Sequence, residues 1–338
     1  MSASGDLSEA LRQWVADEIG DPLATISGVR RTSAGFSREN WVFDASWTEG
    51  GQSRQAALIA RRDPEGSVLA TDRKIETGVL RALQDTPVPS PRLRWVDLDG
   101  TRLGRPALVM DVAEGICDGF VLAGGTPAED RLRLAQELYD RLADIHLLDW
   151  QALGLADVLD DPGERAALVA LEHWESELRR VQLEPEPELE LVTHWLRSQA
   201  PENAVTTVVH GDFKAGNVLL VGDLMHDVGA ATVSAVLDWE TVHLGDPRED
   251  LGWVTNPLRA REHRVPGAWE PADLLARWIE RTGLSAEPEA VHWWSVLANL
   301  KLSAIVLSGS RAFVDGRLDR VHQAPIGIYR LMLDMIGA

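Results

Sequence analysis

The stretch that decides the fold is Val208-Val209-His210-Gly211-Asp212-Phe213-Lys214-Ala215-Gly216-Asn217-Val218-Leu219-Leu220. Apolar residues flank a polar centre on both sides, which is typical of a strand, a loop and a second strand. The loop carries a carboxylate at Asp212, a cation at Lys214 and an amide at Asn217. A second carboxylate, Asp238, follows the short apolar run Ala235-Val236-Leu237. The chain therefore places acidic, cationic and amide groups in two loops that each follow a short strand.

The spacing of these groups suits phosphoryl transfer. The pattern H-x-D-x-x-x-x-N followed by a strand-borne Asp is the catalytic-loop and metal-loop arrangement of kinases. Such a reaction needs a base beside the attacking hydroxyl, and Mg²⁺, which prefers hard oxygen ligands, to neutralise the phosphates. We therefore predict Asp212 as the base, Asn217 and Asp238 as Mg²⁺ ligands, and Lys214 as a point charge for the transferred phosphate. Glu240 stays undecided between a metal contact and a loop-capping acceptor.

Three motifs in this order resemble the aminoglycoside phosphotransferase (APH/choline kinase-like) family, in its broad branch of small-molecule kinases. They read HGDFKAGN at 210–217, LDWE at 237–240 and GDPREDLGW at 245–253. The resemblance implies a two-lobed, protein-kinase-like α+β fold. Residues 1–112 would form an N-lobe with a small antiparallel sheet, and residues 113–338 a mainly helical C-lobe. It also implies ATP and Mg²⁺ as cofactors and a small-molecule hydroxyl as the phosphate acceptor.

The N-terminal part supplies the expected nucleotide site. A short polar loop lies between two expected strands, and its backbone N–H groups can approach phosphates closely. Its predicted phosphate-binding residues are Ser33, Ala34, Gly35, Phe36 and Ser37. The third expected strand, 55–62, ends in two arginines, and alternation places Arg61 on the same face as Ile59. The resemblance implies that Arg61 binds phosphate, where protein kinases use lysine, and that Glu76 on the next helix is its partner.

The connector after the fifth expected strand, 106–112, corresponds to the hinge between lobes in the resembled family. Met110 would shape the adenine pocket, and the backbone from Asp111 and Val112 to Ala113 would face the base. Met110 is equally suited to an ordinary core position, and the two roles are compatible.

Some polar residues near the motifs are expected to be structural. His210 is predicted to be a buried histidine that holds the catalytic loop, and His146 is treated in the same way. Asp250 is expected to tie the catalytic loop to the helix that follows it. Helical periodicity is seen at 7–18, 71–83, 129–148, 163–182, 188–200, 248–255, 271–282, 287–308 and 318–336.

Composition narrows the class of protein. With 338 residues and 45% hydrophobic content, the chain has material for two lobes with substantial cores. Its formal net charge of −20 argues against nucleic acid and anionic membranes as partners. There is no run of about eighteen apolar residues, no signal-peptide pattern at the N-terminus, and one cysteine, Cys117. A cytoplasmic enzyme is expected, and the sequence does not indicate its oligomeric state.

The sequence constrains the identity of the phosphate acceptor less than any other property of the proposed reaction. The segment from Trp253 to Glu270 carries Arg259, Arg261 and Arg264 against two glutamates, a formal balance of +1. Desolvating a polycation against it would be costly. We therefore predict a neutral or anionic acceptor, with a hydroxyacyl thioester as one example. The alternatives are an aminoglycoside or other antibiotic as acceptor, a regulatory pseudokinase that only binds nucleotide, and a metal-dependent phosphohydrolase.

Overall fold

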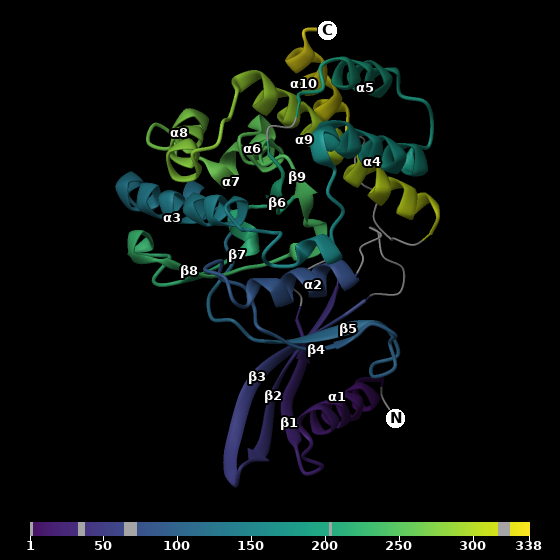
Figure 1. Cartoon of the computed structure of the whole chain (residues 1–338), viewed down its shortest axis with the longest axis vertical. Coiled ribbons are helices and arrows are strands. Elements are labelled where there is room, and N and C mark those ends of the chain that lie inside the picture. Colours follow the sequence, from purple (N-terminus) through teal and green to yellow (C-terminus); the bar gives the residue numbers. More distant parts are fainter. Residues whose placement is uncertain (1–2, 33–37, 64–72, 203–204, 317–324) are drawn as a thin grey trace. The chain divides into compact units, whose positions relative to one another are not determined.

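A computed structural model of the chain describes residues 3–32, 38–63, 73–202, 205–316 and 325–338 (Figure 1). The predicted phosphate loop, Ser33 to Ser37, lies outside the described residues. The chain divides into two compact units. The first comprises Met1–Glu114 and Ser234–Glu240, and the second comprises Gly115–Val233 and Thr241–Ala338. The sequence predicted a single boundary between residues 112 and 113. Residues 234–240 come later in the chain but belong to the first unit, so Asp238 lies in that unit.

The first unit is built on an antiparallel sheet of five strands, in the order β1-β2-β3-β5-β4. The strands are β1 (Thr25–Arg31), β2 (Glu39–Glu49), β3 (Gln52–Arg62), β4 (Leu93–Asp97) and β5 (Ala107–Asp111). β2 and β3 pair without a register shift from Glu39 to Glu49. Gly50 and Gly51 form the two-residue turn between them, with φ of +56° and +78°. Positive φ at both positions is what a tight hairpin turn requires, and glycine adopts it without strain.

The two faces of this sheet have different partners. Helix α1 (Ala3–Ile19) buries Leu11, Trp14 and Val15 against sheet residues that include Leu58 and Ala60. Because side chains alternate along a strand, Arg61 points away from that core. It contacts helix α2 (Arg73–Leu83) instead, through Glu76.

The second unit is mainly helical. Its helices are α3 (Ala128–His146), α4 (Ala166–Val181), α5 (Pro187–Ser198), α6 (Arg248–Val254), α7 (Ala260–His263), α8 (Pro271–Thr282), α9 (Pro288–Val314) and α10 (Ile326–Ile336). Two short strands pair antiparallel, β6 (Thr207–Val209) and β9 (His243–Gly245). A further two-stranded sheet joins β7 (Val218–Val221) and β8 (Thr232–Val236). This mixture of a small antiparallel sheet and many helices is the predicted α+β class.

Helix α9 is the core of the second unit (Figure 1). It packs its buried residues with α4, α5 and α10 in one hydrophobic cluster. In length and composition α9 resembles a membrane-spanning segment, but 78% of its most apolar window is buried inside the protein. Its neighbour α6 approaches it closely at Gly252, where a Cβ atom would lie 2.6 Å from the backbone of Trp294. Glycine at this position is therefore what permits the contact between α6 and α9.

Candidate functional site

A sharp turn after β6 presents Asp212. Gly211 has a φ of +80°, and a Cβ atom there would lie 2.9 Å from the carbonyl oxygen of Thr241. The hydroxyl of Thr241 donates to the carbonyl of His210 at 2.9 Å. His210 is fully buried, and its Nδ1 accepts the backbone N–H of Asp212 at 3.2 Å. Only glycine fits this turn without a clash or strain, which explains the Gly of the HGD motif.

The buried carboxylate of Asp250 holds this turn from the following helix, α6. It accepts the backbone N–H groups of His210 at 2.7 Å and Gly211 at 2.9 Å. His146 lies 3.2 Å from the same carboxylate through Nε2, while its Nδ1 accepts the indole N–H of Trp278 at 2.9 Å. The indole thereby fixes the histidine tautomer, because Nδ1 must be the acceptor and Nε2 the donor. The structural roles expected for His210, His146 and Asp250 agree with these contacts.

Hydrogen bonding keeps Asp250 ionised despite its burial. Burial raises the pKa of the carboxyl, but the hydrogen bond and charge interaction with His146, and then the contacts with His210, lower it to about 2. A carboxylate that accepts several N–H groups behaves in this way. The loop is therefore held by a charged acceptor throughout the physiological pH range.

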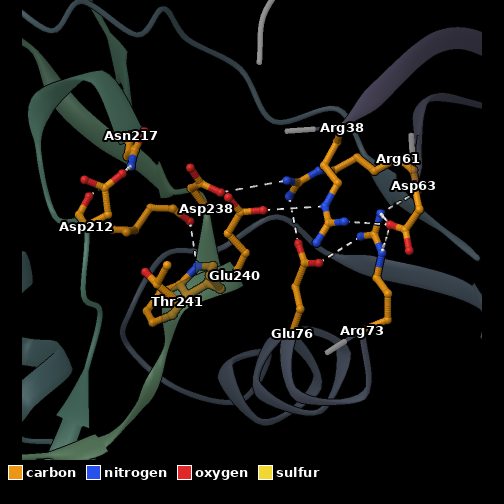
Figure 2. A network of polar contacts seen from close by, with 12 residues as sticks. Arg38, Arg61, Asp63, Arg73, Glu76, Asp212, Asn217, Asp238, Glu240 and Thr241 are labelled. Carbon is orange, nitrogen blue, oxygen red and sulfur yellow. Dashed lines mark hydrogen bonds and ion pairs between the residues drawn. The ribbon is translucent and has the colours of Figure 1, made fainter. Parts of the chain in front are cut away.

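Three of the predicted catalytic-loop residues lie together in the second unit (Figure 2). The carboxylate of Asp212 accepts a hydrogen bond from Lys214 Nζ at 2.6 Å and from Asn217 Nδ2 at 3.0 Å. Asn217 Nδ2 also donates to the backbone carbonyl of Asp212, at 2.9 Å. Since the amide nitrogen is directed at Asp212, the amide oxygen is the atom of Asn217 that suits a hard cation. Lys214 binds the candidate base itself in this structure, so its predicted contact with phosphate would be in addition to this ion pair.

Asp238, in the first unit, has a strained backbone. Its φ is +67°, and among the described residues it is the one non-glycine with positive φ. A conformation of this kind costs about 1–3 kcal/mol and is concentrated at functional sites. The Oδ1 atom of Asp238 is buried, makes no hydrogen bond within the described part of the chain, and lies 3.9 Å from Arg61 Nη2. A buried carboxylate oxygen in this situation fits a metal ligand.

No group of three or more His, Cys, Asp or Glu side chains suited to a metal occurs within the described ranges. Mg²⁺ does not need one, because it is commonly held by one or two carboxylates together with substrate phosphates and water. The oxygen donors of Asp238 and Asn217 therefore fit this ion by their chemistry.

The first unit also contains a buried ion cluster, shown in Figure 2. Arg61 Nη1 donates to Glu76 Oε1 at 2.9 Å, which is the pairing expected from the sequence. Glu76 is 1% exposed; burial raises its pKa, but the charges of Arg61, Arg73 and Arg38 outweigh this and lower it below its ordinary value. Arg61 is thus held in place by a permanently charged partner.

Sequence reasoning missed three members of this cluster, Arg38, Asp63 and Arg73. Arg73 donates to the second oxygen of Glu76 at 2.8 Å and to Asp63 at 2.8 Å. Arg38 donates to Asp63 at 2.8 Å, and its Nε lies 3.5 Å from Glu240. The spacing of Arg73 three residues before Glu76 was the available signal, because i,i+3 pairs meet on a helix.

Glu240 belongs to the same cluster through its ion pair with Arg38. Burial, together with the charge of Asp238, raises its pKa, and Arg38 and Arg61 oppose this. Its contact with Arg38 favours a structural role over the metal contact that was left open.

Backbone hydrogen bonds of the connector after β5 limit which of its groups could meet a base. The N–H of Asp111 donates to Arg92 and that of Val112 to Ala57, both at 2.9 Å. These two N–H groups are already bonded to other backbone carbonyls, so a base bound here would need other backbone groups. Met110 is 4% exposed and contributes to the core, as its alternative role predicted.

Comparison with protein families gives a match over most of the chain. The model of the phosphotransferase enzyme family (APH) matches residues 28–294. Among curated proteins, the chain is 28% identical over 200 residues to acyl-CoA dehydrogenase family member 10 of Mus musculus, covering 58% of this chain and 18% of that protein. It is 29% identical over 271 residues to acyl-CoA dehydrogenase family member 11 of Rattus norvegicus, covering 75% of this chain and 33% of that protein. The chain thus spans about a third or less of the length of these relatives.

Solved structures share the fold. A candidate aminoglycoside phosphotransferase of Ralstonia eutropha JMP134 superimposes with a TM-score of 0.72 at 22% identity, covering 97% of this chain and 95% of that one. The streptomycin–ATP ternary complex of APH(2")-IIa gives a TM-score of 0.57 at 16% identity, covering 91% and 90%. The GDP and kanamycin complex of APH(2")-IIIa gives 0.61 at 14% identity, covering 96% and 97%. Identities this low show that the fold is shared and nothing more. Streptomycin, kanamycin and the nucleotides are ligands of those proteins.

Proposed function

The chain belongs to the phosphotransferase enzyme family, and from that premise we propose that it transfers the γ-phosphoryl group of ATP to a hydroxyl of a small molecule, with Mg²⁺ as cofactor. The observation that carries this proposal is the Asp212 carboxylate, bound by Lys214 and Asn217 on a loop that the buried Asp250 holds rigid. A fixed carboxylate next to a cation and an amide is what positioning a hydroxyl for phosphoryl transfer requires.

Each residue then has a distinct task in the proposal. Asp212 orients the acceptor hydroxyl and takes its proton, and Lys214 stabilises negative charge on the phosphoryl group. Arg61, held by Glu76, binds phosphate oxygens. Mg²⁺, when bound, would neutralise charge on the phosphates, and Asp238 and the amide oxygen of Asn217 are the groups proposed to hold it.

The predicted nucleotide contacts at Ser33–Ser37 and at Met110, Asp111 and Val112 remain part of the proposal. The first would bind the phosphates, and the second would enclose the base. For the second, the bonded N–H groups of Asp111 and Val112 restrict the contacts with adenine to other backbone atoms.

We further propose that the acceptor is neutral or anionic, with a hydroxyacyl thioester as one candidate. Arginines of the 253–270 segment support this: Arg261 lies 5.1 Å from the ring centre of Phe120, whereas Arg259, beside Trp253, is already paired with Glu262 at 2.8 Å. The net positive charge of the segment would repel a polycation. The relatives named as acyl-CoA dehydrogenase family members favour an acyl compound among the candidates. The runner-up is an antibiotic, since neighbouring folds were solved with streptomycin or kanamycin.

The test is a screen for phosphate transfer from ATP. Purified protein would be incubated with Mg²⁺, ATP and either hydroxy acids, hydroxyacyl thioesters, sugars, amino alcohols or kanamycin, with ADP release and phosphorylated product measured. Asp212→Asn is the matched control, because it keeps the shape of the side chain and removes the base. A product formed by the wild type and not by the variant is expected. If no acceptor raises ADP release above the level of the variant, the proposal fails.

A further inference from the structure

Strand β9 carries an imidazole that has a hydrogen-bond acceptor at each ring nitrogen. The Nδ1 atom of His243 lies 3.0 Å from the carbonyl oxygen of Thr241, and Nε2 lies 3.0 Å from a carboxylate oxygen of Glu249. A carbonyl oxygen and an ionised carboxylate can only accept, so each contact needs an N–H group on the ring. A neutral imidazole has one N–H group and the imidazolium has two. The geometry therefore requires that His243 is the imidazolium.

The surroundings of His243 favour this charged form. Burial lowers the pKa of His243, but the charge and hydrogen bond of Glu249 and the carbonyl of Thr241 outweigh it and raise the pKa above the ordinary value of 6.5. The side chain is 39% exposed, so its proton can exchange with solvent. At Gly245 a Cβ atom would lie 3.2 Å from Nε2 of the ring, so glycine at this position leaves space for the imidazole. His243 thus keeps its proton to a higher pH than a free histidine does.

Other charged groups reach His243 from the helices packed around β9. Lys301 of α9 lowers the pKa of His243, in opposition to Glu249 of α6. From α4, His173 interacts electrostatically with His243, and Glu177 of the same helix interacts with His173. The partner strand β6 reads Thr-Val-Val and adds no charge. Burial lowers the pKa of His173 below 6.5. The two histidines therefore titrate on opposite sides of 6.5, and a midpoint above this value identifies His243.

Thr241 connects the imidazolium to the turn that carries the candidate base. Its hydroxyl donates to the carbonyl of His210 at 2.9 Å. Its carbonyl, the acceptor of His243, lies so close to Gly211 that a Cβ atom there would be 2.9 Å away. In addition, β9 pairs antiparallel with β6, the strand that leads into the turn (Figure 1). The contact between His243 and Thr241 therefore supports the backbone immediately before Asp212.

Loss of the proton would leave one of the two ring contacts without a hydrogen. A hydrogen bond to an ionised carboxylate is stronger than one to a carbonyl, so the neutral ring keeps its N–H group at Nε2, facing Glu249. Nδ1 then presents a lone pair to the carbonyl oxygen of Thr241, and two acceptors 3.0 Å apart repel each other. Thr241 has to move, and the support of the turn changes with it.

We propose that His243 is a positioning residue for the catalytic turn, which holds Thr241 against the turn as an imidazolium and releases it when the ring loses its proton. The kinetic part of this inference rests on the proposed phosphotransferase function. Because the pKa is raised in the fold, the support is complete below about pH 6.5 and is lost as the pH rises through the native pKa. The opposing interpretation is that His243 and Glu249 form a half-exposed ion pair with only a local effect. The two interpretations differ in whether the turn responds to the proton.

The sequence allows the turn to be observed on its own. His210-Gly211 is the one His-Gly pair in the chain. In the full chain labelled with ¹³C at histidine carbonyls and ¹⁵N at glycine, the amide of Gly211 is therefore the one glycine signal that couples to a labelled carbonyl. From about pH 5.5 to about pH 9 this signal should shift with a midpoint above 6.5. The ring of His243, identified among the nine histidines with His243→Gln, should titrate at the same midpoint. A Gly211 signal that does not follow the His243 ring overturns the proposal.

Two variants move the midpoint in opposite directions. A lysine ammonium stays charged to about pH 10, so His243→Lys should remove the Gly211 midpoint from this range. Glu249→Gln removes the counter-ion and should lower the midpoint of both the ring and the turn. If His243→Lys does not fold, Glu249→Gln carries the test. His194→Gln, at an exposed position on α5, is the control and should leave the midpoint where it is. A Gly211 midpoint that stays unchanged in the Glu249 or His243 variant overturns the proposal.

Kinetics provide the second readout. At about pH 6.5, His243→Gln should lower kcat about tenfold, less than the roughly hundredfold loss that a 1 Å displacement can cause. The KM for ATP should not change, because the proposed nucleotide contacts involve other residues. At about pH 9 the wild type and His243→Gln should approach the same kcat, and His243→Lys should show no alkaline fall. A ratio of wild type to His243→Gln that is equal at both pH values would show a role independent of the proton and overturn the proposal.

The turn and the reaction are tested separately by these two readouts. If the Gly211 signal follows the protonation of His243 but no acceptor is phosphorylated, the positioning role stands and the phosphotransferase assignment fails. If an acceptor is phosphorylated and the Gly211 signal ignores His243, the phosphotransferase assignment stands and the positioning role fails.

Discussion

His146 donates from Nε2 to the fully buried carboxylate of Asp250 at 3.2 Å, across 104 residues of sequence. This pair connects α3 to α6. Asp250 also accepts two backbone N–H groups of the catalytic loop, which fixes the position of that loop. The position of the Asp212 carboxylate, the proposed base, is therefore set by two buried residues outside the loop. A rigid, ionised acceptor at this position orients the loop without any ligand.

Asp250→Asn is expected to destabilise the fold by about 3 kcal/mol, because it removes the buried charge that three N–H donors share. The native pKa of about 2, against an ordinary value of 3.8, means that the wild-type advantage is complete above about pH 5 and is lost progressively as the pH falls towards 2. Chemical denaturation of both proteins between pH 6 and pH 3 measures this. Asp99→Asn, at an exposed loop carboxylate, is the control. A difference between wild type and Asp250→Asn that is independent of pH would contradict the assignment.

Asp212→Asn should reduce kcat by about 10²–10⁴-fold, the usual contribution of a general base. The side chain keeps its size, and its amide oxygen can still accept from Lys214 and Asn217, so folding and ATP binding should persist. Steady-state kinetics and nucleotide titration measure the two effects. Turnover within a few-fold of the wild type would reject Asp212 as the base.

Asp238→Ala should weaken Mg²⁺-dependent ATP binding far more than binding of metal-free adenosine. The same substitution leaves the backbone strained, because alanine keeps a Cβ atom at positive φ, so we expect no gain in the free energy of unfolding from it. Isothermal titration with and without Mg²⁺, together with denaturation, distinguishes these effects. Arg61→Ala is the companion variant, which should weaken triphosphate binding through lost charge. An unchanged Mg²⁺ dependence in Asp238→Ala would place the metal elsewhere.

Glu76→Gln should destabilise the first unit by about 3–5 kcal/mol, since Arg61 and Arg73 would both lose a buried counter-ion. ATP affinity should fall as well, because Arg61 would no longer be held in position. Denaturation and nucleotide titration test the two parts separately. The exposed pair of Arg12 and Glu9 provides a control in Glu9→Gln, which should leave ATP affinity as it is. Wild-type stability in Glu76→Gln would show that the cluster does not depend on this carboxylate.

Gly211→Ala combines a left-handed backbone with a steric clash, whereas Gly20→Ala carries the backbone strain alone. The φ angles are +80° and +75°, and a Cβ atom at Gly20 would meet nothing within 4 Å. Gly20→Ala should therefore cost about 1 kcal/mol of stability. Gly211→Ala should cost more and should also displace the turn that carries Asp212, with a loss of kcat. Equal stability losses in the two variants would mean that Thr241 does not restrict the turn.

The local pattern of the sequence determined the α+β class, most helices and strands, and the catalytic loop, because these follow from periodicity and spacing within a few tens of residues. The short spacing within the HGDFKAGN motif is enough to place Asp212, Lys214 and Asn217 in one hydrogen-bonded group. Alternation along β3 correctly assigned Arg61, and not Arg62, to the face that meets Glu76.

Only the tertiary structure decided which residues far apart in the sequence form buried ion pairs and buried hydrogen bonds to charged groups. Arg38 and Arg73 both meet Asp63, and Lys301 reaches the Gly211 carbonyl 90 residues away. Apart from the spacing of Arg73 to Glu76, nothing local distinguishes these cations from exposed ones. The tertiary structure also decided that the N–H groups of Asp111 and Val112 are bonded to other backbone carbonyls. The physical reason is that the partner of a buried charge or backbone group is chosen by which elements pack together. That choice depends on the whole core and not on the neighbours of a residue in sequence.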